Sequence, residues 1–191
     1  GGITIAADNA VSSAHNISFV TGGTINLSGN GLVSTANATI TFTNAGTLNI
    51  GGNITADGTV SQTGTGAVSV TGTRTITTTA DDVNFLRAVT LNRPLTIATA
   101  GTGAGAGDGT FQSTVDGGQT LGITAAGSSV VFTGPVGGTT RLGAVTITSA
   151  KDVTESAGFT AASLVQSAGT GLTTLTGLVD TNTATGVNLT T

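Results

Sequence analysis

The sequence predicts an all-β protein that folds as a right-handed parallel β-helix, a β-solenoid whose coils stack along one axis. A short pattern, Phe-x3-Val-x5-Leu, occupies Phe111–Leu121 and returns at Phe132–Leu142, so the step in residue number is 132 − 111 = 21. Apolar residues also come in pairs two positions apart, as at Val130 and Phe132, which is the period of a strand with one buried face. A unit of about 21 residues cannot bury a core alone, so each coil must be covered by the next. Parallel crossovers of this kind are right-handed.

Two wider spacings extend the repeat over most of the chain. An earlier copy of the pattern, Phe85–Leu95, precedes the copy at Phe111 by a step of 111 − 85 = 26. Placing position n on position n + 105 aligns Ile25 with Val130 and Ile40 with Val145. Because 105 is five times 21, we expect a super-repeat of five coils. About nine coils would give a rod of ~40 Å at the usual strand spacing.

The expected strands follow one another along the chain, separated by turns rich in Gly, Asn, Ser and Thr. Upstream of the first pattern they are Ile3–Ile5, Ile17–Val20, Thr24–Leu27, Ala38–Phe42, Thr47–Ile50, Ile54–Ala56, Val68–Val70, Arg74–Thr78, Val83–Phe85, Val89–Leu91 and Leu95–Ile97. Pro94 lacks a backbone donor and therefore belongs at a strand start or corner. The same strands could form antiparallel hairpins in a sandwich, but hairpins do not require a recurring 21-residue step.

Two segments depart from the strand pattern. The glycine-rich stretch Gly101–Gly109 is expected to form a loop that protrudes between coils. Such a loop would explain why the step from Phe85 to Phe111 is longer than the step that follows it. The segment Ala157–Ala162 is the one place where a short helical turn is expected.

Composition limits the functions that the chain can have. Residues 1–191 show no domain boundary, and we expect them to be one fragment of a longer repeat array. Charged residues are 7% and the net charge is −4, with five basic residues, so we expect neither nucleic-acid binding nor attraction to an anionic membrane. Cysteine is absent, which excludes disulfides, thiol catalysis and thiolate metal sites. No apolar run is long enough for a membrane-spanning helix, so we expect no membrane insertion.

Three segments, TFQSTVDGG, VVFTGPVGGTTRLGAVTITSA and AGFTAASLVQSAGTG, resemble the β-strand repeats of very large bacterial surface proteins. These are the filamentous-haemagglutinin-like and related repetitive adhesins. The resemblance covers most of Phe85–Thr191. It implies a right-handed parallel β-helix, secretion, an extracellular or cell-surface location, and a role as stalk, spacer or adhesive surface. The motif defines no binding residue.

The single histidine does not complete a catalytic triad. Ser12 and Ser13 lie close to His15 in sequence, but no spacing supplies the carboxylate that would orient the imidazole. We expect His15 to be a surface turn residue.

The acidic residues do not predict a catalytic site either. Asp81 and Asp82, with Arg87 nearby, resemble the charged groups of a polysaccharide-cleaving β-helix, which must converge on one face from different coils. The carboxylates do not recur at one coil position in the sequence, so we expect solvated turns and no enzyme activity. The acidic residues considered are Asp57, Asp81, Asp82, Asp108, Asp116, Asp152, Glu155 and Asp180.

Neither a cofactor nor a metal is expected. The stretch Gly103–Phe111 resembles one calcium-binding Gly-Gly-x-Gly-x-Asp repeat, with Asp108 as a weak candidate ligand. Calcium requires six to eight oxygens, which that family supplies from tandem copies. Thr-x-Thr pairs, which some solenoids use to bind ice, also arise on any strand with a solvent face. They occur at Thr39/Thr41, Thr75/Thr77, Thr146/Thr148 and Thr174/Thr176.

These observations favour a non-enzymatic structural or adhesive rod from a large secreted bacterial surface protein, acting as stalk, spacer or extracellular fibre. The alternative is a carbohydrate-binding or carbohydrate-cleaving β-helix. Expected partners are neighbouring repeats or second copies stacked end to end, since no polar cap is visible at Gly1 or Thr191. Cell-surface glycans or other matrix components are further candidates.

Overall fold

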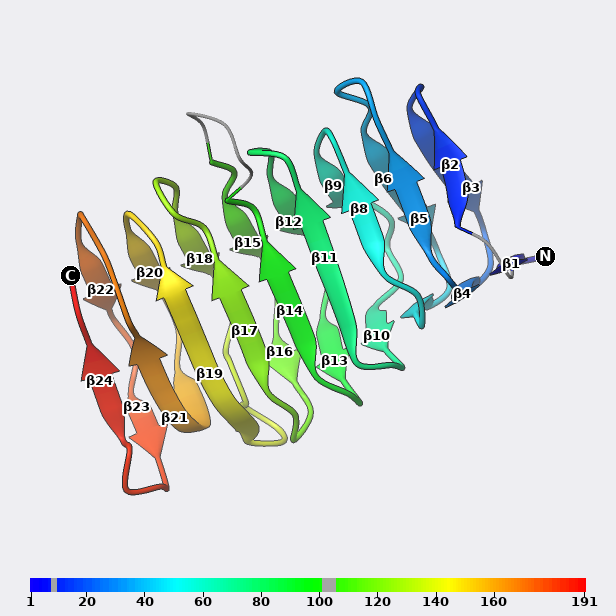
Figure 1. The fold of residues 1–191 in the computed structure, drawn as a ribbon. Coiled ribbons are helices and arrows are strands. Elements are labelled where there is room, and N and C mark those ends of the chain that lie inside the picture. Colours follow the sequence, from blue (N-terminus) through cyan, green and yellow to red (C-terminus); the bar gives the residue numbers. More distant parts are fainter. Residues whose placement is uncertain (8–9, 101–105) are drawn as a thin grey trace.

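The computed structural model describes residues 1–7, 10–100 and 106–191, and in these ranges the chain is a parallel β-solenoid without helices (Figure 1). All paired strands run parallel, so the antiparallel sandwich is excluded and the predicted fold class is confirmed. In Figure 1 the chain rises along the front sheet, crosses the top and descends behind while it advances from right to left, which is a right-handed coil. About eight turns are formed, against the nine expected.

Each turn contributes strands to three sheets. Sheet 1 contains β1 (Ile3–Ala7), β4 (Ile25–Gly29), β7 (Leu48–Ile50), β10 (Val68–Val70), β13 (Val89–Leu91) and β16 (Val115–Asp116). Sheet 2 contains β2 (Val11–Ser13), β5 (Leu32–Ser34), β8 (Ile54–Ala56), β11 (Arg74–Thr78), β14 (Leu95–Ala98), β17 (Leu121–Thr124), β19 (Leu142–Ser149) and β21 (Phe159–Gln166), which pairs with both β23 (Val179–Thr181) and β24 (Val187–Leu189). Sheet 3 contains β3 (Ile17–Thr21), β6 (Ile40–Asn44), β9 (Val60–Gln62), β12 (Val83–Phe85), β15 (Gly109–Phe111), β18 (Val130–Phe132), β20 (Val153–Glu155) and β22 (Thr173–Leu175).

The repeated pattern sets the register at two of its three positions. Phe111 pairs with Phe132, and Val115 bridges to Val136, as the 21-residue step predicts. Leu121 instead pairs with Val145, so its expected alignment with Leu142 is wrong. The corner that follows Val136 is therefore longer than the same corner one coil earlier.

Glycine makes this longer corner possible. Gly137 has a φ of +66°, and a Cβ there would lie 1.9 Å from the carbonyl oxygen of Thr160. The step from coil to coil is unequal along the whole solenoid, and the longest step in sheet 3 contains the glycine-rich stretch. Coil length therefore varies at the corners while strand register is kept. The strands of sheet 3 begin in turn at Ile17, Ile40, Val60, Val83, Gly109, Val130, Val153 and Thr173.

The 105-residue register aligns strands with strands, but it does not equal five coils. It carries Ile25 of sheet 1 onto Val130 of sheet 3, and Ile40 of sheet 3 onto Val145 of sheet 2. Five coils after Ile25 the aligned residue is Val136, a step of 136 − 25 = 111 in residue number. The super-repeat therefore spans about four and two-thirds coils. For that reason it aligns each strand with a strand of the neighbouring sheet.

The two segments that depart from the strand pattern in the sequence are the expected helical turn and the expected glycine-rich loop. The helical turn expected at Ala157–Ala162 is wrong, because this segment leads into strand β21. Phe159 begins that strand, bridges to Val136 and pairs with Val179. Most of the loop expected at Gly101–Gly109 lies outside the described residues, and Gly109 itself begins β15.

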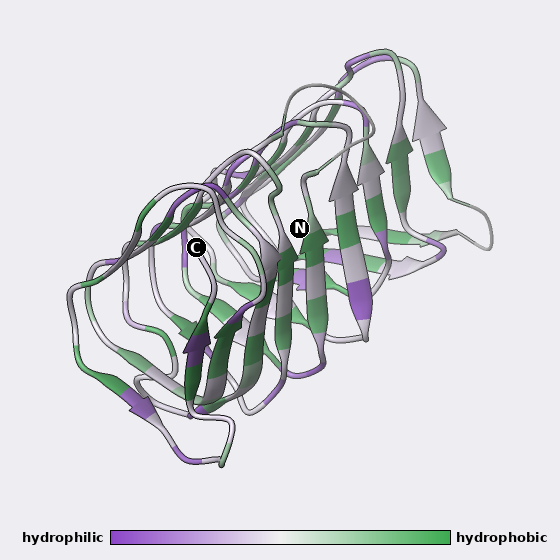
Figure 2. Ribbon diagram, turned by 60° about the vertical axis from the view of Figure 1, so that its left-hand side comes forward, coloured by the Kyte–Doolittle hydropathy of each residue, from purple (hydrophilic) through white to green (hydrophobic). Residues whose placement is uncertain are grey.

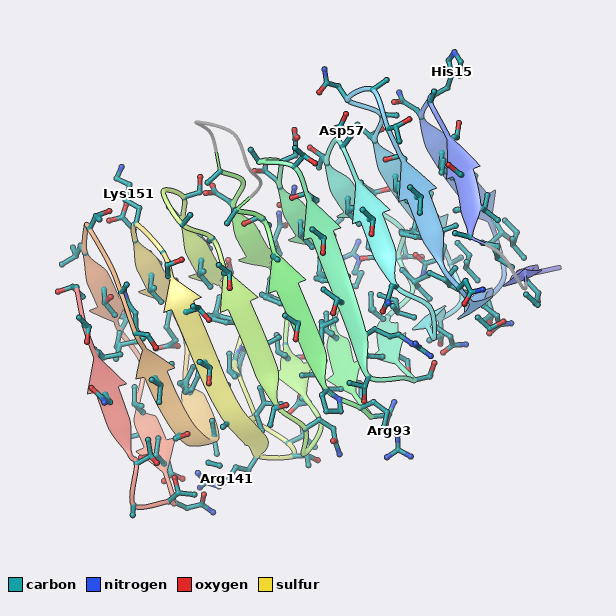
Figure 3. The ribbon with its side chains drawn as sticks, viewed as in Figure 1. His15, Asp57, Arg93, Arg141 and Lys151 are labelled. Atoms are coloured by element: carbon teal, nitrogen blue, oxygen red, sulfur yellow. The ribbon has the colours of Figure 1, made fainter. Side chains whose placement is uncertain are left out.

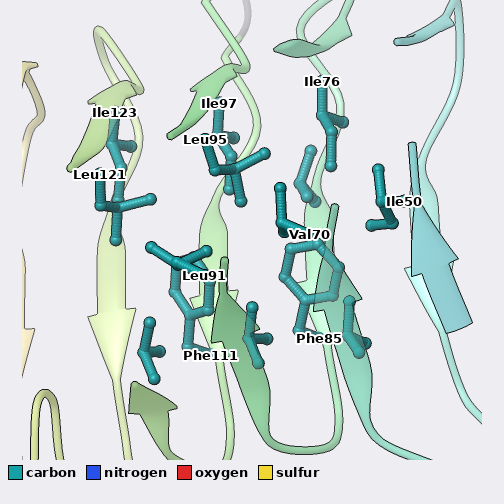
Figure 4. Close-up of a cluster of buried hydrophobic side chains, with 14 of the residues drawn as sticks. Ile50, Val70, Ile76, Phe85, Leu91, Leu95, Ile97, Phe111, Leu121 and Ile123 are labelled. Atoms are coloured by element: carbon teal, nitrogen blue, oxygen red, sulfur yellow. The ribbon is translucent and has the colours of Figure 1, made fainter. Parts of the chain in front are cut away.

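The core is a set of inward-facing columns that run the length of the solenoid, with apolar residues concentrated on the strands (Figure 2). One column in sheet 3 reads Phe19, Phe42, Gln62, Phe85, Phe111, Phe132, Glu155 and Leu175. The rings of Phe85 and Phe111, both labelled in Figure 4, stack at 5.5 Å between centroids. Those of Phe111 and Phe132 stack at 5.2 Å. Ring stacking between coils adds to area burial, since offset aromatic pairs contribute beyond the area they cover.

Replacement of Phe111 by alanine should lower the free energy of unfolding by about 3 to 5 kcal/mol, because its ring contacts a ring in the coil on either side. Urea unfolding followed by circular dichroism measures the loss. Thr110→Ala is the matched control on the outward face of the same strand, with an expected change within about 0.5 kcal/mol. Equal losses in the two variants would contradict the stacked column.

Candidate functional site

Side chains at the corner before sheet 3 link each coil to the next. The residue that precedes the strand is Asn16, Asp82, Asp108 or Asp152 in four of the coils. In each case Oδ1 accepts a hydrogen bond from the backbone N–H of the equivalent residue one coil on, at distances from 2.7 to 3.0 Å. We call these four residues the corner ladder.

The corner ladder corrects the expectation that the carboxylates do not recur at one coil position. Its members precede the segments ISF, VNF, GTF and VTE, each of which begins with the first residue of a sheet 3 strand. In the sequence, each of these Asn or Asp residues is followed three positions later by a Phe or Glu of the inward column. This pattern is hard to recognise because the number of residues between successive corner-ladder residues is unequal.

Other acidic and amide side chains also bond to backbone groups of an adjacent coil. Asp116 Oδ1 accepts the N–H groups of Thr139 and Thr140 at 2.8 and 3.1 Å. Asn53 Oδ1 accepts the N–H of Thr75 at 3.1 Å, and Asp57 Oδ2 that of Asn37 at 2.9 Å. These bonds satisfy amides at corners and, for Thr75, near the start of strand β11.

A carboxylate is also buried inside the solenoid. Glu155 is fully buried at a position that phenylalanine occupies in the three preceding coils. Its Oε1 accepts the N–H of Ala157 at 2.6 Å, and its Oε2 accepts the N–H of Gly177 in the next coil at 3.1 Å. Backbone donors thus compensate the buried charge.

Gln62 is the second polar interruption of the phenylalanine column. Its Nε2 donates to Asn44 Oδ1 at 3.0 Å and to the carbonyls of Gly64 and Gly66 at 3.1 and 3.0 Å. Neither Gln62 nor Glu155 is foreseen from the sequence, where both look like ordinary surface polar residues. Each one bonds the turn that leaves its own strand.

Of the candidate residues that the sequence offered, His15, Asp57 and Arg87 lie on the periphery of the solenoid, whereas Glu155 is buried and not in a solvated turn as expected. His15 is exposed in the turn between β2 and β3, where its backbone N–H donates to Ser13 Oγ at 3.0 Å (Figure 3). The exposed Arg87 donates its Nε–H to the carbonyl of Gly64 at 3.2 Å. Figure 3 shows Asp57 and Lys151 at turns along one edge of the solenoid, and Arg93 and Arg141 at turns along the opposite edge.

Asp108 serves as a coil-to-coil acceptor. Its Oδ1 accepts the N–H of Ser129, and its own N–H donates to Asp82 Oδ1. Residues 103–105 of the proposed calcium repeat lie outside the described part of the chain. Among residues 1–7, 10–100 and 106–191, no group of three or more His, Cys, Asp or Glu side chains is placed to hold a metal, and no pocket is formed.

The outward faces are lined mainly by neutral hydroxyl and amide side chains. In sheet 3 one outward column reads Ser18, Thr41, Ser61, Asn84, Thr110, Val131, Thr154 and Thr174. The Thr-x-Thr pairs divide between two sheets, since Thr75/Thr77 and Thr146/Thr148 lie in sheet 2 whereas Thr41 and Thr174 lie in sheet 3. Within the described ranges, no helix meets the length and hydropathy that a membrane span requires.

The environment of Asp81 disfavours the ionised form of its carboxyl group. Burial raises the pKa of the Asp81 carboxyl above its ordinary value of 3.8, and the negative charges of Asp82 and Asp57 raise it further. Three acidic residues from two adjacent coils therefore gather near this corner.

Comparison with known proteins gives no relative: no family description, no curated protein and no solved structure matches the chain.

Removal of one corner-ladder acceptor should destabilise the fold without altering its shape. Asp108→Ala leaves the N–H of Ser129 without its partner, and we expect a loss of about 1 to 2 kcal/mol in the free energy of unfolding. Asp108→Asn keeps an oxygen acceptor and should lose less. Chemical denaturation of both variants makes the comparison, and an alanine variant as stable as the asparagine variant would contradict a bonding role.

Neutralising Asp81 should stabilise the protein at neutral pH. A carboxyl whose pKa is raised in the folded state favours folding below its ordinary value of 3.8, and this contribution is lost as the pH rises through the raised value. Asp81→Asn should therefore have a higher unfolding midpoint than the parent at about pH 7, and the difference should vanish near pH 3. Thermal unfolding across this range tests the sign, and a variant that is less stable at about pH 7 would contradict it.

Proposed function

We propose that the chain is a non-enzymatic structural rod segment of a large secreted bacterial surface protein, which acts as stalk, spacer or fibre and presents a neutral, adhesive exterior. The observation that carries the proposal is the use of the acidic side chains. Asp82, Asp108, Asp116, Asp152 and Glu155 all accept backbone N–H groups of an adjacent coil. They therefore serve the stacking of coils.

The exterior supports the same proposal. The outward column of sheet 3 consists mostly of Ser, Thr and Asn side chains, one per coil, with a strand spacing of about 4.8 Å. A surface of this kind offers many equivalent weak contacts in place of one specific site. That property suits a spacer, or an adhesive surface that acts through many copies.

A spacer must hold its ends at a fixed separation. Ser18 and Thr174 belong to one outward column and are separated by seven strand spacings, so spin labels on Ser18→Cys and Thr174→Cys should report about 34 Å with a narrow distribution. Ser18→Cys with Thr110→Cys, four spacings apart, is the control at about 19 Å. The measurement is double electron–electron resonance in excess unlabelled protein, and the native chain contributes no cysteine. A broad distribution for the longer pair would contradict a rigid rod.

The proposal also predicts that the chain does not cleave polysaccharides. The chain should release neither reducing ends nor unsaturated uronic products from neutral and uronic polysaccharides. Weak binding on a glycan array, unchanged in Asp82→Asn, would agree with an adhesive exterior. Cleavage that is abolished in Asp82→Asn would overturn the proposal in favour of a carbohydrate-cleaving β-helix.

A further inference from the structure

Charges of opposite sign lie along the two long edges of sheet 2. The corner that leads from sheet 2 to sheet 3 carries five carboxylates among the described residues, with Lys151 as the one cation beside them, and we call this corner the acidic rim. The corner that leads from sheet 1 to sheet 2 carries three arginines, and we call it the basic rim. The carboxylates are Asp57, Asp81, Asp82, Asp108 and Asp152, and the arginines are Arg74, Arg93 and Arg141.

The face between the two rims is neutral. Figure 3 shows sheet 2 in front, with Asp57 on one edge and Arg93 on the other. The outward side chains of its strands form two columns of small residues without charge. One column reads Val33, Thr55, Thr77, Ala98 and Thr124, and the other reads Thr75, Thr96, Gly122, Thr146 and Val165.

Most of the rim charges have no opposite charge within the described part of the chain. The ion pairs there are Arg141–Asp180 and Lys151–Asp152, which leaves Arg74 and Arg93 on the basic rim without a carboxylate. Arg74 Nε is buried and has no hydrogen-bond partner. On the acidic rim, the negative charges of Asp57 and Asp82 act on Asp81. Each rim therefore carries charge that a surface of the opposite sign would neutralise.

The unpaired charges of the two rims lie at the same levels along the rod. Arg74 begins β11 and Asp81 follows its end, whereas Arg93 precedes β14 and Asp108 follows it. Because β11 and β14 are neighbours in sheet 2, the two levels are one strand spacing apart, about 4.8 Å. A two-fold axis parallel to the rod keeps every residue at its level and exchanges the rims. The face is thus complementary to itself under this rotation, as a two-fold interface requires.

We propose that the sheet 2 face binds the same face of a second copy of the chain, with the two rods parallel and related by this two-fold axis. The inference goes beyond the proposed function, which concerns a single rod. In the pair, Asp81 of each copy faces Arg74 of the other, and Asp108 faces Arg93. A neutral centre is enclosed by charged rims, which is the usual anatomy of a protein interface.

The centre of the interface joins the two outward columns of sheet 2. Sheets that pack face to face lie about 10 Å apart, and the two-fold axis sets one column of each copy against the other column of its partner. At the level of β17 this places Thr124 over Gly122, whose missing side chain leaves room for the threonine. At the level of β11 it places Thr77 over Thr75, and their hydroxyls can both donate and accept hydrogen bonds.

Charge reversal on each rim tests the pairing. Neither the Asp81 nor the Arg93 side chain bonds within the described chain, so both can be changed with little effect on the rod. Sedimentation velocity at low salt should show a dimer whose population rises with concentration. Asp81→Lys alone and Arg93→Glu alone should each weaken it about tenfold or more, since each sets like charges together at two places. An equimolar mixture should form a 1:1 heterodimer, and the double variant should dimerise by itself, because both restore opposite charges at both rims.

A matched pair of lysine substitutions tests the face. Thr96 lies at the centre of the sheet 2 face, and Thr90 lies on the outward face of sheet 1; both are exposed. Thr96→Lys should abolish the dimer, because it sets two ammonium groups against each other in the interface. Thr90→Lys should dimerise like the parent. A Thr96→Lys variant that dimerises as well as the parent would show that the rods meet elsewhere, and would overturn the proposal.

Salt and a folding measurement complete the test. Raising the ionic strength from about 0.01 M to about 1 M shortens the Debye length from about 30 Å to about 3 Å, and should therefore dissociate the dimer. Circular dichroism and the Ser18–Thr174 label distance report whether each variant keeps the fold, and that distance is as expected if the rod proposal holds and this one fails. A parent chain that stays monomeric at high concentration and low salt, or a dimer that salt does not weaken, contradicts the paired rims.

Discussion

Every part of this structure depends on the in-register pairing of each strand with its equivalent in the next coil. The backbone hydrogen bonds of the three sheets run along the axis, so a coil is stabilised by its neighbours above and below. The inward columns follow from this pairing, because a residue that lies over its equivalent also lies over a side chain of similar shape. Phe85, Phe111 and Phe132 form one stack for that reason.

Polar side chains complete the pairing where the backbone leaves the sheets. At the corners the chain turns, and its amides point along the axis without a strand to receive them. The corner ladder and Asp116 supply oxygens to such amides, and Gln62 and Glu155 bond to turn backbone from within the core. Among the described residues, charge is thus sparse, and most acidic side chains bond to backbone amides.

The strand period, the solenoid class and the stacking of Phe111 on Phe132 could be predicted because each depends on local spacing. Coil length could not, since glycine corners such as the one at Gly137 absorb extra residues without disturbing the strands. Because coil length varies, the sequence did not reveal the corner ladder. It also did not reveal that the 105-residue register aligns each strand with a strand of the neighbouring sheet. The burial of Glu155 could not be predicted, because the groups that donate to it are the backbone N–H groups of Ala157 and Gly177, and every residue type except proline has such a group.

The backbone hydrogen bonds of the three sheets run along the axis of the solenoid, and this direction has a mechanical consequence. Tension applied to the two ends would load the hydrogen bonds of one coil boundary at a time, since the chain can leave the rod by peeling from an end. Each detached coil of about 21 residues would release on the order of 70 Å of extended chain. Under load such a rod would lengthen in a series of similar steps and dissipate work at each of them.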